Sequence, residues 1–236
     1  MKNLTIKIFS DGADVNEMKI ASQNGLIMGF TTNPTLMKKS GITDYEKFAR
    51  EAIQNVNNLP ISFEVFSDDF ESMEKEAVKI SGWGDNIYVK IPVTNTKRES
   101  SVELIKSLDK KGIKLNITAI LTIMQVQDLF DILNEKSKSI ISVFAGRIAD
   151  TGVDPVPIMK EAKSILSPKR NLELLWASSR ELLNIFQAQE CGCDIITVTN
   201  DLLKKMKMVG MDLSDLSLDT VKMFYNDAKL AGYKIL

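Results

Sequence analysis

The chain contains no histidine among its 236 residues, which excludes several common kinds of active site. Histidine is the most frequent general base and metal ligand, and a Ser-His-Asp triad cannot be built without it. Cysteine is nearly absent, and the two present, Cys191 and Cys193, cannot hold a zinc ion at this spacing alone. We interpret them as small buried side chains near a turn. No metal or cofactor is expected, so any catalysis must use Asp, Glu, Lys, Ser, Thr, Asn or Arg.

The sequence also lacks a charge imbalance and any long apolar segment. The net charge is −1, so no broad basic field attracts nucleic acid or an anionic membrane. No apolar run approaches the ~20 residues of a membrane-spanning helix. Residues 1–7 are strand-like and have no signal-peptide core. We therefore expect no nucleic-acid partner, no membrane partner and a cytoplasmic location.

The chain does contain a regular alternation of apolar strand-like segments and amphipathic helices. Strands are predicted over residues 4–10, 26–30, 61–66, 87–94, 114–119, 140–144, 172–177 and 194–198. Helices are predicted between them, including 97–111 and 179–190, with a loop over 147–156 and a final helix over about 218–231. Alternation of this kind indicates a parallel sheet.

Eight strand–helix units in a chain of this length predict a (β/α)8 TIM barrel. The competing fold is an open doubly wound sheet, but no G-x-G-x-x-G turn follows the first strand. We expect residues 1–236 to form a single domain. The C-terminal helix, about 218–231, is expected to pack on the barrel or on a neighbouring subunit.

The fourth predicted strand carries a lysine, Lys90, in the middle of an apolar run. Burial disfavours the ammonium form, so the pKa of Lys90 should fall and leave the neutral amine that a Schiff-base nucleophile needs. Two other interpretations remain: Lys90 reaches solvent at a strand end, or it pairs with a buried carboxylate. For a lone lysine in an apolar strand these two interpretations are favoured, so other residues must decide whether Lys90 is a nucleophile.

A (β/α)8 barrel gathers the carboxyl ends of its strands at one mouth. The polar residues at or near the predicted strand ends are Asp11, Asn33, Glu64, Lys90, Asn116, Thr118, Ser142, Arg147, Ser178 and Arg180. Taken singly, Asp11 and Asn33 could be helix caps, and the two arginines could form surface ion pairs. The turn at residues 178–180 opens a predicted helix, where free N–H groups, hydroxyls and a guanidinium would bind phosphate.

Together these residue types suit aldol chemistry through a lysine imine. A neutral amine attacks a ketone to give a carbinolamine and then an imine, which accepts electrons as the adjacent carbon–carbon bond breaks. Asp11 and Glu64 could divide the proton transfers, and Thr118 could hold a water. The amides and hydroxyls could bind the hydroxyls of a sugar, and the arginines its phosphate. The set predicts class I aldol chemistry on a phosphorylated sugar.

Several segments resemble motifs of the transaldolase family. Residues 29–36, G-F-T-T-N-P-T-L, are similar to its T-T-N-P-[ST] signature. Residues 89–94, V-K-I-P-V-T, resemble the Schiff-base lysine segment of the small bacterial and archaeal members. Further segments that resemble family motifs, in the family's order, are 115–118, 142–148, 177–180 and 188–203. The resemblance implies a (β/α)8 barrel of the class I aldolase type.

The resemblance also implies a role for each candidate residue. Lys90 would be the Schiff-base nucleophile, Glu64 and Asp11 the acid/base carboxylates, and Thr118 the residue that holds the catalytic water. The implied substrate-binding residues are Asn33, Asn116, Ser142 and Phe144 around the dihydroxyacetone unit, and Arg147, Ser178 and Arg180 around the sugar phosphate.

The implied activity is that of a transaldolase of the pentose phosphate pathway, working without a cofactor on sugar-phosphate substrates. It would move a dihydroxyacetone unit from sedoheptulose 7-phosphate or fructose 6-phosphate to glyceraldehyde 3-phosphate or erythrose 4-phosphate. In short relatives the C-terminal helix helps to build oligomers, which implies a homo-oligomer here.

Two positions bear on which reaction is completed. The related fructose-6-phosphate aldolases typically carry a glutamine where Glu64 stands and a tyrosine where Phe144 stands. Because phenylalanine cannot protonate a free enamine, transfer is favoured over release of dihydroxyacetone. An aldolase and a non-catalytic sugar-phosphate-binding barrel remain as alternatives. Gly12 departs from the family's usual threonine and could loosen the strand end that aims Asp11.

Overall fold

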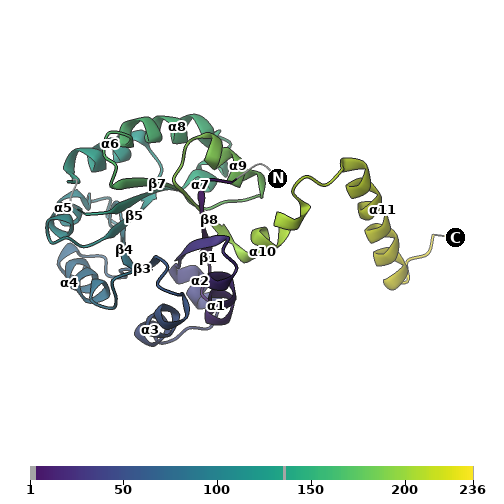
Figure 1. The fold of residues 1–236 in the computed structure, drawn as a ribbon, viewed down its shortest axis with the longest axis horizontal. Helices are drawn as coiled ribbons and strands as arrows, with labels where there is room; N and C mark the ends of the chain where they lie inside the picture. Colours follow the sequence, from purple (N-terminus) through teal and green to yellow (C-terminus); the bar gives the residue numbers. More distant parts are fainter. Residues whose placement is uncertain (1–3, 135–136, 236) are drawn as a thin grey trace.

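The computed structural model describes residues 4–134 and 137–235 of the chain. Its strands form a closed parallel barrel in the order of the sequence, from β1 to β8. The strands are β1 (Lys7–Asp11), β2 (Ile27–Thr31), β3 (Ile61–Glu64), β4 (Ile87–Pro92), β5 (Leu115–Ile120), β6 (Ser139–Val143), β7 (Leu172–Trp176) and β8 (Ile195–Thr199). Helices surround this ring (Figure 1). The predicted (β/α)8 barrel is confirmed.

The helices are α1 (Val15–Gln23), α2 (Pro34–Lys39), α3 (Tyr45–Asn55), α4 (Phe70–Ser81), α5 (Val102–Lys110), α6 (Ile123–Ile132), α7 (Ala145–Ala149), α8 (Pro155–Leu166), α9 (Leu183–Glu190), α10 (Asn200–Leu203), the 3-10 helix η1 (Lys204–Met208) and α11 (Leu213–Leu230). Many begin at a side-chain cap. Asn33 accepts a hydrogen bond from the N–H of Leu36, and Pro34 occupies the first turn of α2, as its fixed φ favours.

The predicted loop over 147–156 is wrong, because this stretch contains part of α7 and the beginning of α8. Asp154 accepts a hydrogen bond from the N–H of Val156 and Pro155 stands in the first turn of α8. A polar cap followed by proline starts a helix as readily as it forms a turn.

Helix α5 begins at Val102, five residues later than predicted. The side chain of Asn95 accepts hydrogen bonds from the N–H groups of Lys97 and Glu99, each at 3.0 Å. An Asn side chain that binds the backbone in this way competes with a helix for the same N–H groups. The turn that it closes delays the start of the helix.

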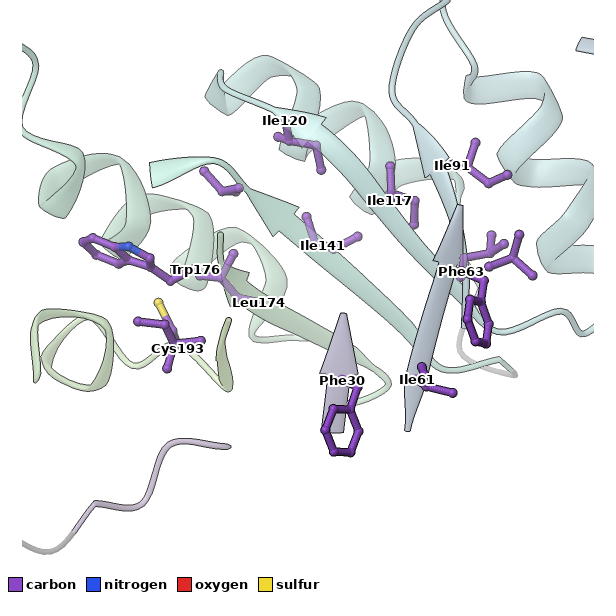
Figure 2. Packing of buried hydrophobic residues seen from close by; sticks show 14 of the residues in the cluster. Phe30, Ile61, Phe63, Ile91, Ile117, Ile120, Ile141, Leu174, Trp176 and Cys193 are labelled. Atoms are coloured by element: carbon purple, nitrogen blue, oxygen red, sulfur yellow. The ribbon is translucent and has the colours of Figure 1, made fainter. Parts of the chain in front are cut away.

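Successive residues of a strand point to opposite sides of the barrel wall, so each strand directs one set of side chains toward the helices and another toward the inside of the ring. The outward-facing residues, among them Phe63, Ile117 and Trp176, form the large buried cluster between strands and helices (Figure 2). Both cysteines are buried and unpaired, as predicted.

Inside the ring, a smaller apolar cluster is formed by Phe9, Tyr88, Ile140, Leu175, Ala177 and Ile195. Phe9 needs the absence of a side chain at Gly29, where a Cβ atom would lie 2.5 Å from its ring. Along β4 and β6, Lys90 and Ser142 follow Tyr88 and Ile140 at two-residue spacing, so they point inward nearer the carboxyl ends of the strands. The apolar cluster thus lies beneath the polar mouth.

The C-terminal helix α11 begins five residues before the predicted 218 and is capped by Asp212. None of its residues is buried, and it extends away from the barrel beyond α10 (Figure 1). No helix in the described part of the chain is both long enough and apolar enough to cross a membrane.

Candidate active site

A cavity of about 390 Å³ opens at the carboxyl ends of the strands. It brings together every predicted site residue: Asp11, Asn33, Glu64, Lys90, Asn116, Thr118, Ser142, Phe144, Arg147, Ser178 and Arg180. These residues come from β1, from β3 to β6, from the start of α7 and the residue before it, and from the segments that follow β2 and β7. The cavity therefore has a lysine, two carboxylates, hydroxyls, amides and two arginines in its wall.

Lys90 lies at the centre of three adjacent strands, paired in register with Glu64 on β3 and with Asn116 on β5. Only 7% of Lys90 is exposed. Its Nζ lies 3.2 Å from Oε2 of Glu64 and donates a hydrogen bond to the carbonyl of Thr32 at 2.9 Å. The lysine is thus buried and also paired with a carboxylate, and both side chains line the cavity.

Asp11 is held at the end of β1 by a short chain of hydroxyls. Thr31 donates to Oδ1 of Asp11 at 2.8 Å, and the Thr31 hydroxyl lies 2.5 Å from that of Thr197 on β8. Thr31 has a single proton to give, so Thr197 is the donor in the second bond. Asp11 is not a helix cap, since Asp14 caps α1.

Burial raises the pKa of the Asp11 carboxyl, and it outweighs the positive charge of Lys90 and the hydrogen bond from Thr31, which both lower the pKa. A carboxylate whose pKa is raised is a stronger base, and so is better matched to proton transfer near neutral pH. The position gives Asp11 the property that a general base requires.

Asn116 is fixed by two serines. Its Nδ2 donates to Ser62 at 2.9 Å, and Ser142 donates to its Oδ1 at 2.6 Å. Thr118, two residues further along β5, has a buried hydroxyl with no hydrogen-bond partner among the described residues. Buried polar groups are rarely left unpaired, so this hydroxyl is suited to a water molecule or a substrate group.

The arginines lie at the rim of the cavity, and one of them is already paired. Arg180 binds both carboxylate oxygens of Asp150 in a bidentate pair, which lowers the pKa of Asp150. Arg147 is exposed and lies over Phe144, with its Cζ 5.7 Å from the ring centroid. The surface ion pair that the sequence left open as an alternative therefore exists for Arg180, and the residue lines the cavity as well.

The expectation of free backbone N–H groups in the turn at residues 178–180 is wrong for Arg180, whose N–H is already hydrogen-bonded. The N–H groups of Arg180 and Glu181 both donate to Oδ1 of Asn184, at 2.8 and 3.1 Å. Helix α9 begins only at Leu183, so this turn does not present a helix N-terminus to a ligand. An anion bound at this turn therefore cannot use the N–H groups of Arg180 and Glu181.

The turn at Ser178 depends on a close backbone approach. Ser178 has a φ of 60°, a left-handed conformation that is uncommon for residues other than glycine. At Gly146 in α7, a Cβ atom would lie only 1.6 Å from the carbonyl oxygen of Ser178. Glycine at 146 therefore allows α7, which carries Arg147, to lie directly against the turn that carries Ser178 and Arg180.

Sequence reasoning missed several residues of this neighbourhood. Ser62 and Thr197 alternate with apolar residues on their strands, and that pattern could have identified them as inward-facing. Asp150 and Tyr45 gave no such signal. No group of three or more Cys, Asp or Glu side chains that could hold a metal ion occurs in residues 4–134 and 137–235.

The fold and the cavity define the class: a (β/α)8-barrel protein with a buried lysine–carboxylate pair at its mouth. The family model described as transaldolase/fructose-6-phosphate aldolase matches residues 8–234. The chain belongs to this family.

Curated relatives agree with the family. A probable transaldolase from Thermoanaerobacter sp. (strain X514) is 34% identical over 231 residues, covering 98% of this chain and 100% of that protein. A probable transaldolase from Nitrosopumilus maritimus (strain SCM1) is 33% identical over 204 residues, covering 85% of this chain and 87% of that one.

Solved structures support the fold alone. A 4-hydroxy-tetrahydrodipicolinate synthase from Methylacidiphilum fumariolicum SolV matches with a TM-score of 0.58 at 12% identity, over 85% of this chain and 70% of that one. A dihydrodipicolinate synthase from Rhodopseudomonas palustris matches with a TM-score of 0.54 at 13% identity, over 91% of this chain and 79% of that one.

Proposed function

We propose that this protein is a transaldolase that transfers a dihydroxyacetone unit between sugar phosphates through an imine on Lys90. The observation that carries the proposal is the buried Nζ of Lys90, 3.2 Å from the Glu64 carboxylate in a cavity lined by Arg147 and Arg180. The family match and the names of the relatives support the same activity.

The first half of the reaction uses Lys90 and Glu64. The neutral amine of Lys90 attacks the C2 ketone of the donor to form a carbinolamine, which loses its hydroxyl as water and becomes an iminium. Glu64 is the carboxylate that lies within reach of the lysine nitrogen. It supplies the proton for this dehydration, through a water held by the unpartnered hydroxyl of Thr118.

The second half breaks the bond between C3 and C4 of the donor. Asp11 takes the proton of the C4 hydroxyl, the electrons of the broken bond pass into the iminium, and an aldose phosphate leaves. The three-carbon enamine stays on Lys90, where Asn33, Asn116 and Ser142 bind its hydroxyls. Addition to the incoming aldose phosphate runs these steps in reverse and returns the proton from Asp11.

Retention of the enamine separates a transaldolase from an aldolase. Phe144 lies in the cavity wall and has no hydroxyl, so it cannot protonate the enamine carbon and release dihydroxyacetone. We expect fructose 6-phosphate or sedoheptulose 7-phosphate as donor and erythrose 4-phosphate or glyceraldehyde 3-phosphate as acceptor, as in the pentose phosphate pathway. Arg147, Ser178 and Arg180 would bind the phosphate.

The test is borohydride trapping. Protein incubated with fructose 6-phosphate and reduced with sodium borohydride should carry a three-carbon adduct on Lys90, identified by mass spectrometry of the peptides. Lys90→Ala should abolish both the adduct and the activity, a loss of at least about 10³-fold. Lys97→Ala, at a turn outside the cavity, is the matched control and should leave both unchanged.

The outcomes separate the alternatives. Sugar turnover only with erythrose 4-phosphate present supports transfer, whereas steady release of dihydroxyacetone without acceptor identifies an aldolase. Absence of an adduct on Lys90 refutes both enzymes and leaves a sugar-phosphate-binding barrel.

We also propose that the protein is a homo-oligomer in which α11 packs on a neighbouring subunit. Val221, Phe224, Tyr225 and Ala228 lie on one side of α11 at helical spacing. Phe224 and Tyr225 are 63% and 67% exposed, and no residue of α11 is buried against its own barrel. A second copy of the chain would cover this apolar side.

A further inference from the structure

The last residue of β3, Glu64, lies where the sheet loses a neighbour. The pairing of β2 with β3 ends at Thr31 and Ser62. On the other side, the N–H groups of Ile61 and Val65 donate to carbonyls next to or in β4, at 3.0 and 3.2 Å. Because alternate residues of a strand direct their N–H groups to opposite neighbours, the N–H of Glu64 faces the side where β2 has already ended.

The hydroxyl of Tyr45 takes the place of the missing strand residue. The N–H of Glu64 donates to it at 2.7 Å, and the hydroxyl donates in turn to the carbonyl of Glu64 at 2.9 Å. Two residues earlier on β3, the carbonyl of Ser62 accepts a hydrogen bond from the hydroxyl of Thr32 at 3.0 Å. Two side-chain hydroxyls therefore complete the hydrogen bonding of this edge, and the one at Glu64 satisfies two backbone groups at once.

Tyr45 is itself fixed in place. It is the first residue of α3, and its ring lies among Phe63, Phe66 and Trp83, with centroid distances of 6.0, 4.5 and 5.6 Å. Burial raises the pKa of the Tyr45 hydroxyl, so it stays protonated and remains a donor. The three rings hold the hydroxyl against the end of β3.

Tyr45 does not line the candidate active site. It lines a second cavity of about 190 Å³, and Glu64 borders both cavities. Glu64 is thus the residue that connects Tyr45 to the candidate active site.

We infer that Tyr45 is a positioning residue: its hydroxyl fixes the end of β3 and thereby holds the Glu64 carboxylate at hydrogen-bonding distance from Nζ of Lys90. The inference rests on the proposed function. Without the hydroxyl, the N–H and carbonyl of Glu64 lose their partner and the strand end must rearrange to find others. Displacement of a catalytic group by about 1 Å can cost as much as 10²-fold in rate.

The test is Tyr45→Phe, which keeps the ring and removes only the hydroxyl. For transfer from fructose 6-phosphate to erythrose 4-phosphate, kcat should fall about 10-fold and KM should change less than about twofold, because the phosphate-binding residues are untouched. Rates are normalised to the fraction of chains that borohydride traps as an adduct, so unfolded protein does not count. Phe66→Leu is the matched control: it loosens the same ring cluster, leaves both hydrogen bonds to Glu64 and should keep kcat.

A double-mutant cycle distinguishes positioning from a general structural effect. If Tyr45 acts through the Glu64 carboxylate, Tyr45→Phe should lower kcat little further in a Glu64→Gln background. A wild-type kcat in Tyr45→Phe, or an undiminished loss in the Glu64→Gln background, overturns the inference while the proposed function stands. A wild-type protein that forms no adduct refutes the proposed function and this inference with it.

Discussion

Asp11 is a residue whose surroundings disfavour the ionised form that a general base needs. It lines the cavity at the end of β1 beside Thr31, and burial raises its pKa above the ordinary value of 3.8. A group with a higher pKa in the folded state binds its proton more tightly there than in the unfolded chain. Stability then falls as pH rises from about the ordinary pKa through the folded-state pKa. Ionised Asp11 therefore costs the fold stability at neutral pH.

The variant Asp11→Asn should consequently be more stable and less active. At pH 8 we expect its free energy of unfolding to exceed that of the wild type by on the order of 1 kcal/mol, while turnover falls about 10²-fold or more because the proposed base is lost. The gain should disappear as pH falls below 3.8, where Asp11 is protonated in both states. Urea unfolding over a series of pH values measures it. An Asp11→Asn variant less stable than the wild type at pH 8 would contradict the argument.

The sequence predicts the side chains that strand ends place in the cavity. It predicts less well the residues that hydrogen-bond to these side chains and hold them in position. Asp11, Glu64 and Lys90 stand at or near predicted strand ends, so the barrel alone places them in one cavity. Asp150 and Tyr45 reach their partners across 30 and 19 residues of sequence. Such contacts depend on how helices pack, and no short-range periodicity encodes them.

Among the elements, α7 and the turn after β7 lie in close backbone contact at Gly146 and Ser178. A Cβ atom at Gly146 would meet backbone at Ser178, which cannot move aside as a flexible side chain can. Helix α7 would have to shift and carry Arg147 with it.

We therefore predict that Gly146→Ala lowers stability by about 1–3 kcal/mol, as overpacking does, and raises KM for phosphorylated substrates several-fold. Thermal unfolding and steady-state kinetics measure the two effects. Gly12→Ala is the control and should change neither, because a Cβ atom there has its nearest neighbour at 3.9 Å. Equal behaviour of the two variants would show that α7 is not tightly fitted.

Strands were easier to predict from the sequence than helices. The strands are short segments rich in apolar, buried residues, and that signal survives without knowledge of the fold. The end of α7 and the start of α8 lie in the stretch predicted as a loop, because Gly152 and Asp154-Pro155 are typical of turns and helix starts alike. The sequence suggests that Gly12 loosens the end of β1. In the structure, the N–H of Gly12 donates to the carbonyl of Thr31 at 3.1 Å, which links this strand end to β2.

At the scale of the whole molecule, α11 is the element that its own barrel leaves uncovered. If a second subunit covers it, Phe224→Asp should place a charge in the interface and lower the oligomer mass, measured by light scattering coupled to size exclusion. Asn226→Asp, which adds the same charge on the other side of the helix, should leave the mass unchanged. A wild-type protein that runs as a monomer, or equal masses for both variants, would contradict the proposed packing.

The closure of the barrel has a consequence for the growing chain. Lys90, Glu64 and Asn116 lie on three consecutive strands, whereas Asp11 is held through Thr31 by Thr197, from the last strand. During synthesis, Lys90 leaves the ribosome long before Thr197, whose hydroxyl completes the hydrogen bonding around Asp11. Until β8 has been synthesised and pairs with β1, Thr197 cannot hold Thr31, so the hydrogen bonds that position Asp11 are completed only with the final strand.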